Sequence, residues 1–261
     1  MVLAERYRDA LVRLRALAAR RARQAWLNLG RWDRADVDRF TGAVVPMVGA
    51  VQARTTSLTD SYLSRMVGSR VVGLPPQVGA LVRNGTDPAD VYARPFVQLW
   101  SALGDGTPFD DALDASAARV DATAQTDVQL SVTHSTREWL ADPPADAPRI
   151  VGYSRTLTGE SCALCAVAST QIYKNEDLMP IHDRCDCGVA PIFDDRDAAK
   201  AINRDRLRQL KASDQYTTDK AKLSHLRVNA DGEITPPKVA VHEHGELGPV
   251  LADSAHEFTS L

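Results

Sequence analysis

Residues 162–187 read CALCAVASTQIYKNEDLMPIHDRCDC, and this stretch holds all four cysteines of the 261-residue chain. A C-x-x-C pair opens it, and sixteen residues further on comes an H-x-x-C-x-C cluster. The candidate ligands are Cys162, Cys165, His182, Cys185 and Cys187. Two ligand pairs joined by a short segment have the spacing of a structural zinc site, in which the metal fixes four donors tetrahedrally. The sequence therefore predicts one Zn2+ site.

Five donors compete for four places at this site. In an extended segment Cys185 and Cys187 point to one side, which favours an all-thiolate site with Cys162 and Cys165. His182 could instead replace one of the C-terminal pair and give a site of three thiolates and one imidazole. The alternatives to metal are two disulfides or simply buried thiols. Disulfides need an oxidising compartment, and we expect no export signal because the first residues lack an uninterrupted apolar region.

The residues around the cysteines resemble a known family, the phage Mu protein F-like minor head proteins. The pattern of that family is an aromatic and arginine lead-in, a glycine, C-x-x-C, a tyrosine, H-x-x-C-x-C and a proline. The matching positions in this chain are Tyr153, Arg155, Gly159, Cys162, Cys165, Tyr173, His182, Cys185, Cys187 and Pro191. The last twenty residues, HEHGELGPVLADSAHEFTSL, are also similar to the tail of such proteins from phages of actinobacteria. The resemblance covers about the C-terminal two-fifths of the chain, and the rest is similar only in its helical character.

The resemblance implies a minor capsid protein that takes part in head morphogenesis. Its expected partner is the phage portal protein, with the scaffold or major capsid protein as further candidates. Its expected location is the interior of the virion head near the portal, and the host cytoplasm during assembly. It would act by binding, with zinc as a structural support. The alternative function is a capsid maturation protease, because similar phage proteins often carry that label.

The sequence offers no good active site for that alternative. No G-x-S-x-G, P-loop or dinucleotide-binding glycine motif is present. His134 and Ser135 are adjacent, and neighbours on a helix diverge by about a hundred degrees, so they cannot form a dyad alone. His242 and His244 lack the H-E-x-x-H spacing of zinc proteases. A closed site of four ligands leaves no position for a catalytic water. We therefore predict no catalytic residue.

The first 141 residues are expected to be helical and to form a domain that docks on the portal or scaffold. Apolar periodicity predicts helices over residues 3–29, 34–69, 86–104 and 107–140. Asp33 is the expected cap of the second helix, Thr86 or Asp87 that of the third, and Thr107 that of the last. Pro46 with Gly49 predicts a kink in the second helix, and Pro95 is expected to split the third.

The predicted fold class is α+β, with a mainly helical N-terminal domain followed by a smaller α+β module. The Pro-rich segment 142–148, DPPADAP, is the expected linker. The zinc-binding module then covers residues 149–213, with strands near 149–156 and 189–193 and helices at 161–170 and 195–212. A C-terminal extension covers residues 214–261, in which Asp231-Gly232 predicts a turn between two strands.

Composition and charge limit the partners. Aromatic residues are only 6% of the chain, so the core must be mostly Ala, Val and Leu. The net charge of −3 gives no general attraction to nucleic acid, and no apolar run is long enough for a membrane span. The first helix nevertheless has a basic face, formed by Arg6, Arg8, Arg13, Arg15, Arg20, Arg21 and Arg23. This face is either simply solvated or in salt-dependent contact with packaged double-stranded DNA.

Overall fold

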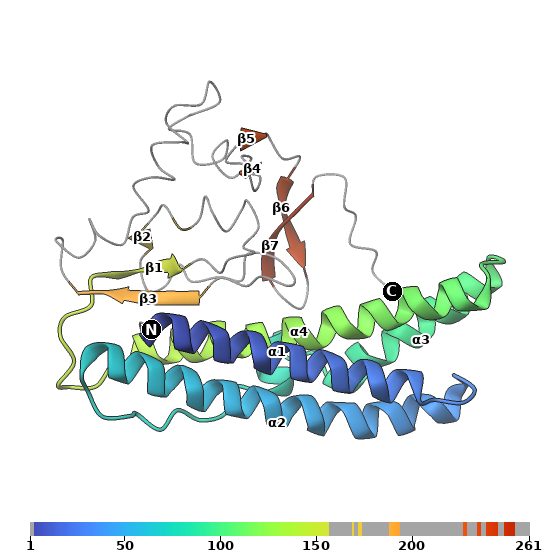
Figure 1. The fold of residues 1–261 in the computed structure, drawn as a ribbon, viewed down its shortest axis with the longest axis horizontal. Helices are drawn as coiled ribbons and strands as arrows, with labels where there is room; N and C mark the ends of the chain where they lie inside the picture. The colour runs from blue at the N-terminus through green and yellow to red at the C-terminus, as the bar shows by residue number, and fades with distance from the viewer. Residues whose placement is uncertain are drawn as a thin grey trace.

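The structure is a computed structural model of α+β class, dominated by helices (Figure 1). It describes residues 3–156, 169 and 188–193, and the backbone alone of residues 172–173, 227–228, 234–235, 239–244 and 248–253. The helices are α1 (Leu3–Leu27), α2 (Arg34–Val67), the 3-10 helix η1 (Gly79–Arg83), α3 (Pro88–Gly104) and α4 (Phe109–Ala141). The strands are β1 (Gly152–Thr156), β2 (Ile172–Tyr173), β3 (Gly188–Ile192), β4 (Arg227–Val228), β5 (Ile234–Thr235), β6 (Val239–His244) and β7 (Gly248–Asp253).

The four long helices begin and end close to the predicted positions, because their caps are written in the sequence. The side chain of Asp33 accepts a hydrogen bond from the backbone N–H of Asp36 at the start of α2. Asp87 does the same for Ala89 at the start of α3. Gly68 ends α2 in the left-handed conformation, with φ 75°, which glycine adopts without strain.

Two local predictions are wrong. Pro95 does not split the third helix, since α3 runs continuously from Pro88 to Gly104 and Pro95 is buried inside it. Thr107 does not cap α4; Pro108 occupies the N-cap position and provides no side-chain hydrogen bond. The second helix also continues through Pro46 as one element. Tertiary packing of the apolar faces outweighs the cost of a proline at these positions.

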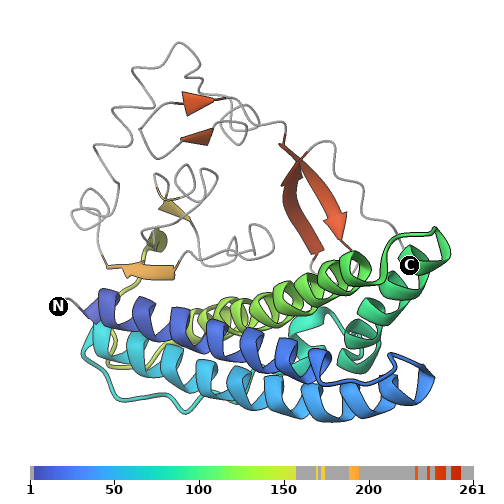
Figure 2. The ribbon, with the colours of Figure 1, turned by 45° about the vertical axis from the view of Figure 1, so that its right-hand side comes forward.

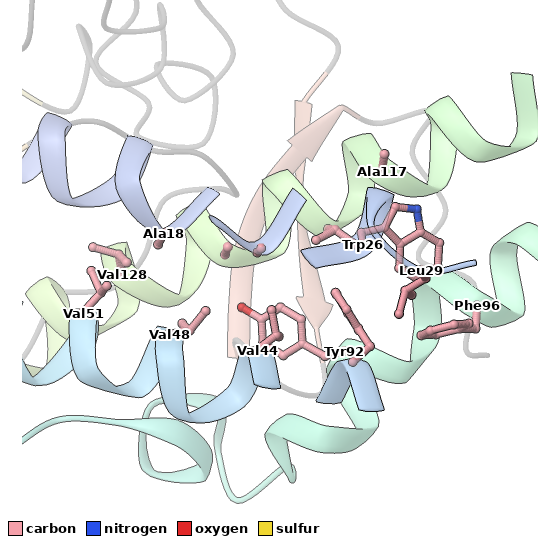
Figure 3. Packing of buried hydrophobic residues seen from close by; sticks show 14 of the residues in the cluster. Ala18, Trp26, Leu29, Val44, Val48, Val51, Tyr92, Phe96, Ala117 and Val128 are labelled. Atoms are coloured by element: carbon pink, nitrogen blue, oxygen red, sulfur yellow. The ribbon is translucent and has the colours of Figure 1, made fainter. Parts of the chain in front are cut away.

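Helix α4 is the centre of the bundle and lies against α1, α2 and α3 (Figure 2). Every residue from 126 to 133 in α4 is buried, so this part of the helix has no solvent face. Along it lies an apolar core that runs from Val51 and Val128 to Trp26 and Phe96 (Figure 3). Apolar residues of α1 and α2 line this core and a second cluster.

The strands begin after the Pro-rich segment 142–148, as the change in periodicity predicts. The order β2-β1-β3 forms an antiparallel sheet, and Tyr153 and Val189 of this sheet join a second apolar cluster with Tyr7, Leu11 and Tyr62 of the bundle. The sheet lies beside the N-terminal end of α1 in both ribbon views (Figures 1 and 2). Since sheet and bundle share a core, the division into separate domains stays a prediction.

Two further hairpins are formed by the C-terminal part of the chain. Strands β4 and β5 pair antiparallel on either side of the predicted Asp231-Gly232 turn. Strands β6 and β7 pair from Val239↔Asp253 to His244↔Gly248, and the sequence patterns did not predict this hairpin. The helices predicted at 161–170 and 195–212 lie outside the described residues. None of the described helices is long and apolar enough to cross a membrane.

Candidate functional site

The five predicted zinc ligands, Cys162, Cys165, His182, Cys185 and Cys187, lie outside the described residues. Among the residues that are described, no group of three or more His, Cys, Asp and Glu side chains could hold a metal. The predicted metal site is therefore judged from the strands that flank it along the chain. These strands are β1 before the first cysteine pair, β2 between the two clusters, and β3 directly after Cys187.

The register of the sheet places the ends of these strands together. Thr156, the last residue of β1, lies opposite Gly188, the first residue of β3. Ile172, the first residue of β2, lies opposite Ser154 in the antiparallel pair β1–β2. The segment 157–171 therefore leaves and rejoins the sheet at the end where β3 begins. Thr156, six residues before Cys162, and Gly188, directly after Cys187, thus lie opposite each other at one end of the sheet.

Gly188 sits where this end of the sheet is most crowded. A Cβ at this position would lie 2.6 Å from Oγ1 of Thr156, a distance that real Cβ atoms do not show. A larger residue at this position would require the side chain of Thr156 to turn away.

A second constellation, which sequence reasoning missed, is a row of buried polar side chains between α2 and α4. It holds the connector (residues 68–78) that leads from α2 to η1. The carboxylate of Asp60, 1% exposed, accepts hydrogen bonds from the backbone N–H groups of Val72, Gly73 and Leu74 at 3.1, 2.7 and 3.0 Å. These bonds satisfy polar backbone groups of a segment that has no helix or strand partners.

Further along the row, the connector is held from both helices. Thr56 of α2 accepts a hydrogen bond from the backbone N–H of Gln77 at 3.0 Å, and Ser131 of α4 donates to the carbonyl of Gln77 at 2.7 Å. Gln52 accepts from the N–H of Gly79 and donates to the carbonyl of Asp127. The connector thus runs along the surface with only Gln77 buried, and its backbone is held by buried side chains distant in sequence.

A buried ion pair ends this polar row. Nε of Arg83 donates to Oδ1 of Asp127 at 2.5 Å, and the hydroxyl of Tyr92 donates to Oδ2 at 2.7 Å. Burial, followed by the charge of Asp127, raises the pKa of Tyr92 well above its usual value, so Tyr92 acts as a hydrogen-bond donor. Tyr92 and Asp127 border a largely apolar cavity of about 210 Å³ between α2, η1 and α3. Both carboxylate oxygens of Asp127 accept hydrogen bonds from buried side chains, so we interpret Asp127 as a residue that stabilises the fold.

His134 and Ser135 are placed as the helix geometry predicts. Ser135 is fully buried and its hydroxyl lies 3.1 Å from Oγ1 of Thr56, so it is engaged with α2. His134 is half-buried; burial, followed by the charge of Arg137, lowers the pKa of its imidazole below 6.5. The two side chains therefore do not form a catalytic dyad. His242 and His244 belong to β6, of which only the backbone is described.

The basic face of α1 is narrower than the sequence predicts. Arg15 is 3% exposed and donates to Oε1 of Gln129 in α4 at 2.9 Å, which corrects its assignment to the solvent face. Arg8 is partly shielded and pairs with Asp9 at 3.3 Å. The exposed arginines that repeat at seven-residue steps are Arg6, Arg13 and Arg20. At 1.5 Å per residue they are spaced about 10 Å apart.

The sequence of α4 at the buried polar row does not show the apolar stripe that normally indicates burial. Residues 126–133 read TDVQLSVT, which mixes polar and apolar residues and shows no helical stripe. Apolar periodicity alone places half of them in solvent. Their burial is explained by the elements packed around α4, since Gln129 meets Arg15 of α1, Asp127 meets η1 and α3, and Ser131 meets the connector.

Comparison of the chain with protein-family models, with curated proteins and with solved structures finds no match.

Proposed function

We propose that this protein is a phage minor head protein that associates with the portal inside the procapsid and acts by binding. Its C-terminal module would be held by one structural zinc ion. One observation carries the proposal. In the sequence, Cys162, Cys165, His182, Cys185 and Cys187 follow one another between β1 and β3 in the pattern of the phage Mu protein F-like family. A helical bundle before this module agrees with the helical character of that family.

The residues fit a structural zinc ion in kind. Thiolate and imidazole are the donors that zinc prefers, and a four-coordinate site would stabilise the small sheet around it. The pairing of Thr156 with Gly188 supports convergence, since both ligand-bearing segments reach the same end of the sheet. Four of the five donors would bind the metal, either as four thiolates or as three thiolates and the imidazole of His182.

The proposed mechanism is docking without turnover. The helical part would contact the portal or scaffold, and the protein would remain in the head of the virion. The narrowed basic face of α1, with Arg6, Arg13 and Arg20, is the part that would touch packaged DNA. Such contact would be non-specific and would weaken as salt rises, because it depends on the release of counterions from phosphates.

The test is co-expression of the chain with the portal protein of the same phage. We expect both proteins to elute as one complex in size-exclusion chromatography and to enter procapsids together. Separate elution and absence from procapsids would overturn the proposal. The protease alternative is tested in parallel by incubating the purified chain with the major capsid protein. Cleavage that stops when a single serine or histidine of this chain is replaced would establish the alternative.

A further inference from the structure

The end of the bundle away from the sheet exposes large apolar side chains that the proposed function leaves unexplained. Here the α1–α2 loop meets the turn between α3 and α4. We call this the aromatic patch, and it consists of Trp32, Val97, Trp100, Leu103 and Phe109. Trp100 is 42% exposed and Phe109 is 45% exposed. Gathered large apolar groups of this kind mark interaction surfaces, whereas single exposed ones do not.

The aromatic patch is rigid. The indole N–H of Trp100 donates to the backbone carbonyl of Trp32 at 2.7 Å, across the two loops. The ring of Trp32 meets that of Phe109 edge-to-face, with centroids 5.5 Å apart. Trp100 also contacts Phe96, which is fully buried in the apolar core, with ring centroids 5.9 Å apart. A partner would therefore meet aromatic side chains that are already ordered, which lowers the entropic cost of binding.

The backbone beneath the patch is held in an unusual conformation. Trp32 has φ 51°, in the left-handed region that residues other than glycine seldom adopt. The carboxylate of Asp36 stabilises this turn by accepting the backbone N–H groups of Arg31 and Trp32 at 3.1 and 2.8 Å. The turn presents the carbonyl of Trp32 to Trp100 and its ring to Phe109. Local strain thus accompanies the assembly of an exposed surface.

The charge around the patch determines what can bind there. Residues 97–114 contain four aspartates and no lysine or arginine, and Asp105, Asp110 and Asp111 are exposed. The α1–α2 loop adds Asp33, with Arg31 and Arg34 as the bases nearby. A second copy of this chain would bring the same acidic rim against itself, which like-charge repulsion disfavours. A partner with basic residues around apolar ones would complement the surface.

We infer that the aromatic patch is a docking site for a basic amphipathic segment of another protein. Apolar side chains of that segment would pack on Trp100 and Phe109, and its Lys or Arg residues would face the aspartates. Around these aromatic anchors the exposed aspartates Asp33, Asp105, Asp110 and Asp111 outnumber Arg31 and Arg34. Aromatic hot spots with a rim of mainly one charge favour partners of the opposite charge. The inference is independent of the proposed function, because it uses only the helical bundle and neither the metal nor the portal.

The experiment uses the full chain and three synthetic labelled peptides of equal length. One peptide has Leu at three- and four-residue steps and Lys elsewhere to form a basic amphipathic helix, one has Glu in place of Lys, and one has Ser in place of Leu. Fluorescence anisotropy should show saturable binding of the Lys/Leu peptide, at least about tenfold tighter than that of the other two. Equal binding of the Lys/Leu and Glu/Leu peptides would overturn the inference.

Substitutions in this chain show whether the Lys/Leu peptide binds at the aromatic patch. Trp100→Ala should weaken the Lys/Leu peptide about tenfold, as expected for a hot-spot residue. The matched control is Leu81→Ala, since Leu81 is 58% exposed but lies in η1, before the start of α3. The double variant Asp110→Asn and Asp111→Asn, at exposed positions that leave the rings intact, should weaken binding and reduce its salt dependence.

Equal affinity of all these variants would contradict the assignment, and so would an effect of Leu81→Ala as large as that of Trp100→Ala. Sedimentation of the native chain tests whether a second copy of this chain occupies the aromatic patch instead. A dimer of the native chain that dissociates on Trp100→Ala would show that the patch binds a second copy instead. A monomer that binds the Lys/Leu peptide through Trp100 supports the inference.

Discussion

The interiors of the two halves of the helical bundle contain different kinds of side chain. Near the α1–α2 loop, Trp26, Phe40 and Phe96 pack edge-to-face in an apolar core. Nearer the sheet, a second apolar cluster is accompanied by buried Thr, Ser, Gln and Asp side chains of α2 and α4 that hold the connector. Non-directional apolar burial tolerates adjustment, whereas each polar contact has a fixed geometry and is costly when broken. The second half therefore specifies one chain path more strictly than the first.

The largest expected loss comes from the apolar half. The ring of Phe40 contacts the rings of Trp26, Tyr92 and Phe96, and its side chain is 1% exposed. Phe40→Ala should lower the free energy of unfolding by about 4 kcal/mol, as transfer and cavity terms add. Urea denaturation followed by circular dichroism measures this. A loss below about 1 kcal/mol would show that the core can collapse around the cavity.

The next largest effect tests the buried ion pair of the polar half. Asp127→Asn keeps the shape of the side chain but removes the negative charge that pairs with the buried Arg83. We expect a loss of about 3 kcal/mol, because one partner of a buried pair is removed. The matched control is Arg39→Ala, which breaks the Arg39–Asp36 pair of 2.8 Å, in which Arg39 is 70% exposed. That control should cost less than about 1 kcal/mol. Equal losses for the two variants would contradict the structural role of the buried pair.

A smaller effect isolates the connector. Thr56→Val preserves volume but leaves the N–H of Gln77 without its acceptor and Ser135 without its partner. The expected loss is about 2 kcal/mol, the cost of an unsatisfied buried donor. Amide hydrogen exchange at Gln77 should also become faster. Thr41→Val is the control, since Thr41 bonds only to carbonyls of its own helix and should change stability little. Unchanged exchange at Gln77 would show that the connector is held by other contacts.

The smallest effect is a pH dependence at the solvent edge of α4. Since the pKa of His134 is lowered in the folded state, the unfolded chain takes up a proton at a higher pH than the folded chain. His134 therefore permits full stability above about pH 6.5 and reduces it as the pH falls below that value. His134→Gln should remove this part of the pH dependence. Identical stability profiles of the native chain and the variant between about pH 7.5 and about pH 5.5 would contradict the shift.

The sequence predicts the apolar half well, because a buried stripe such as that of Phe40, Val44 and Val48 needs only helical periodicity and caps. It does not predict the polar half. Asp60 binds the backbone of the connector, and Asp127 binds Arg83 of η1 and Tyr92 of α3. No local pattern encodes these distant partners. Arg15 was misplaced for the same reason, since its partner Gln129 is distant in sequence. At the candidate site, the strands on either side of the ligands were predicted, but the pairing of Thr156 with Gly188 required the structure.

The proposed function depends most directly on the metal, because the resemblance to the phage family is carried by its ligands. Elemental analysis of the full chain, purified under reducing conditions without chelator, should find about one zinc ion per chain. Replacement of both Cys162 and Cys187 by Ala should abolish it, and Trp100→Ala should leave it unchanged. A metal-free native chain, or cysteines found in disulfides, would contradict the account.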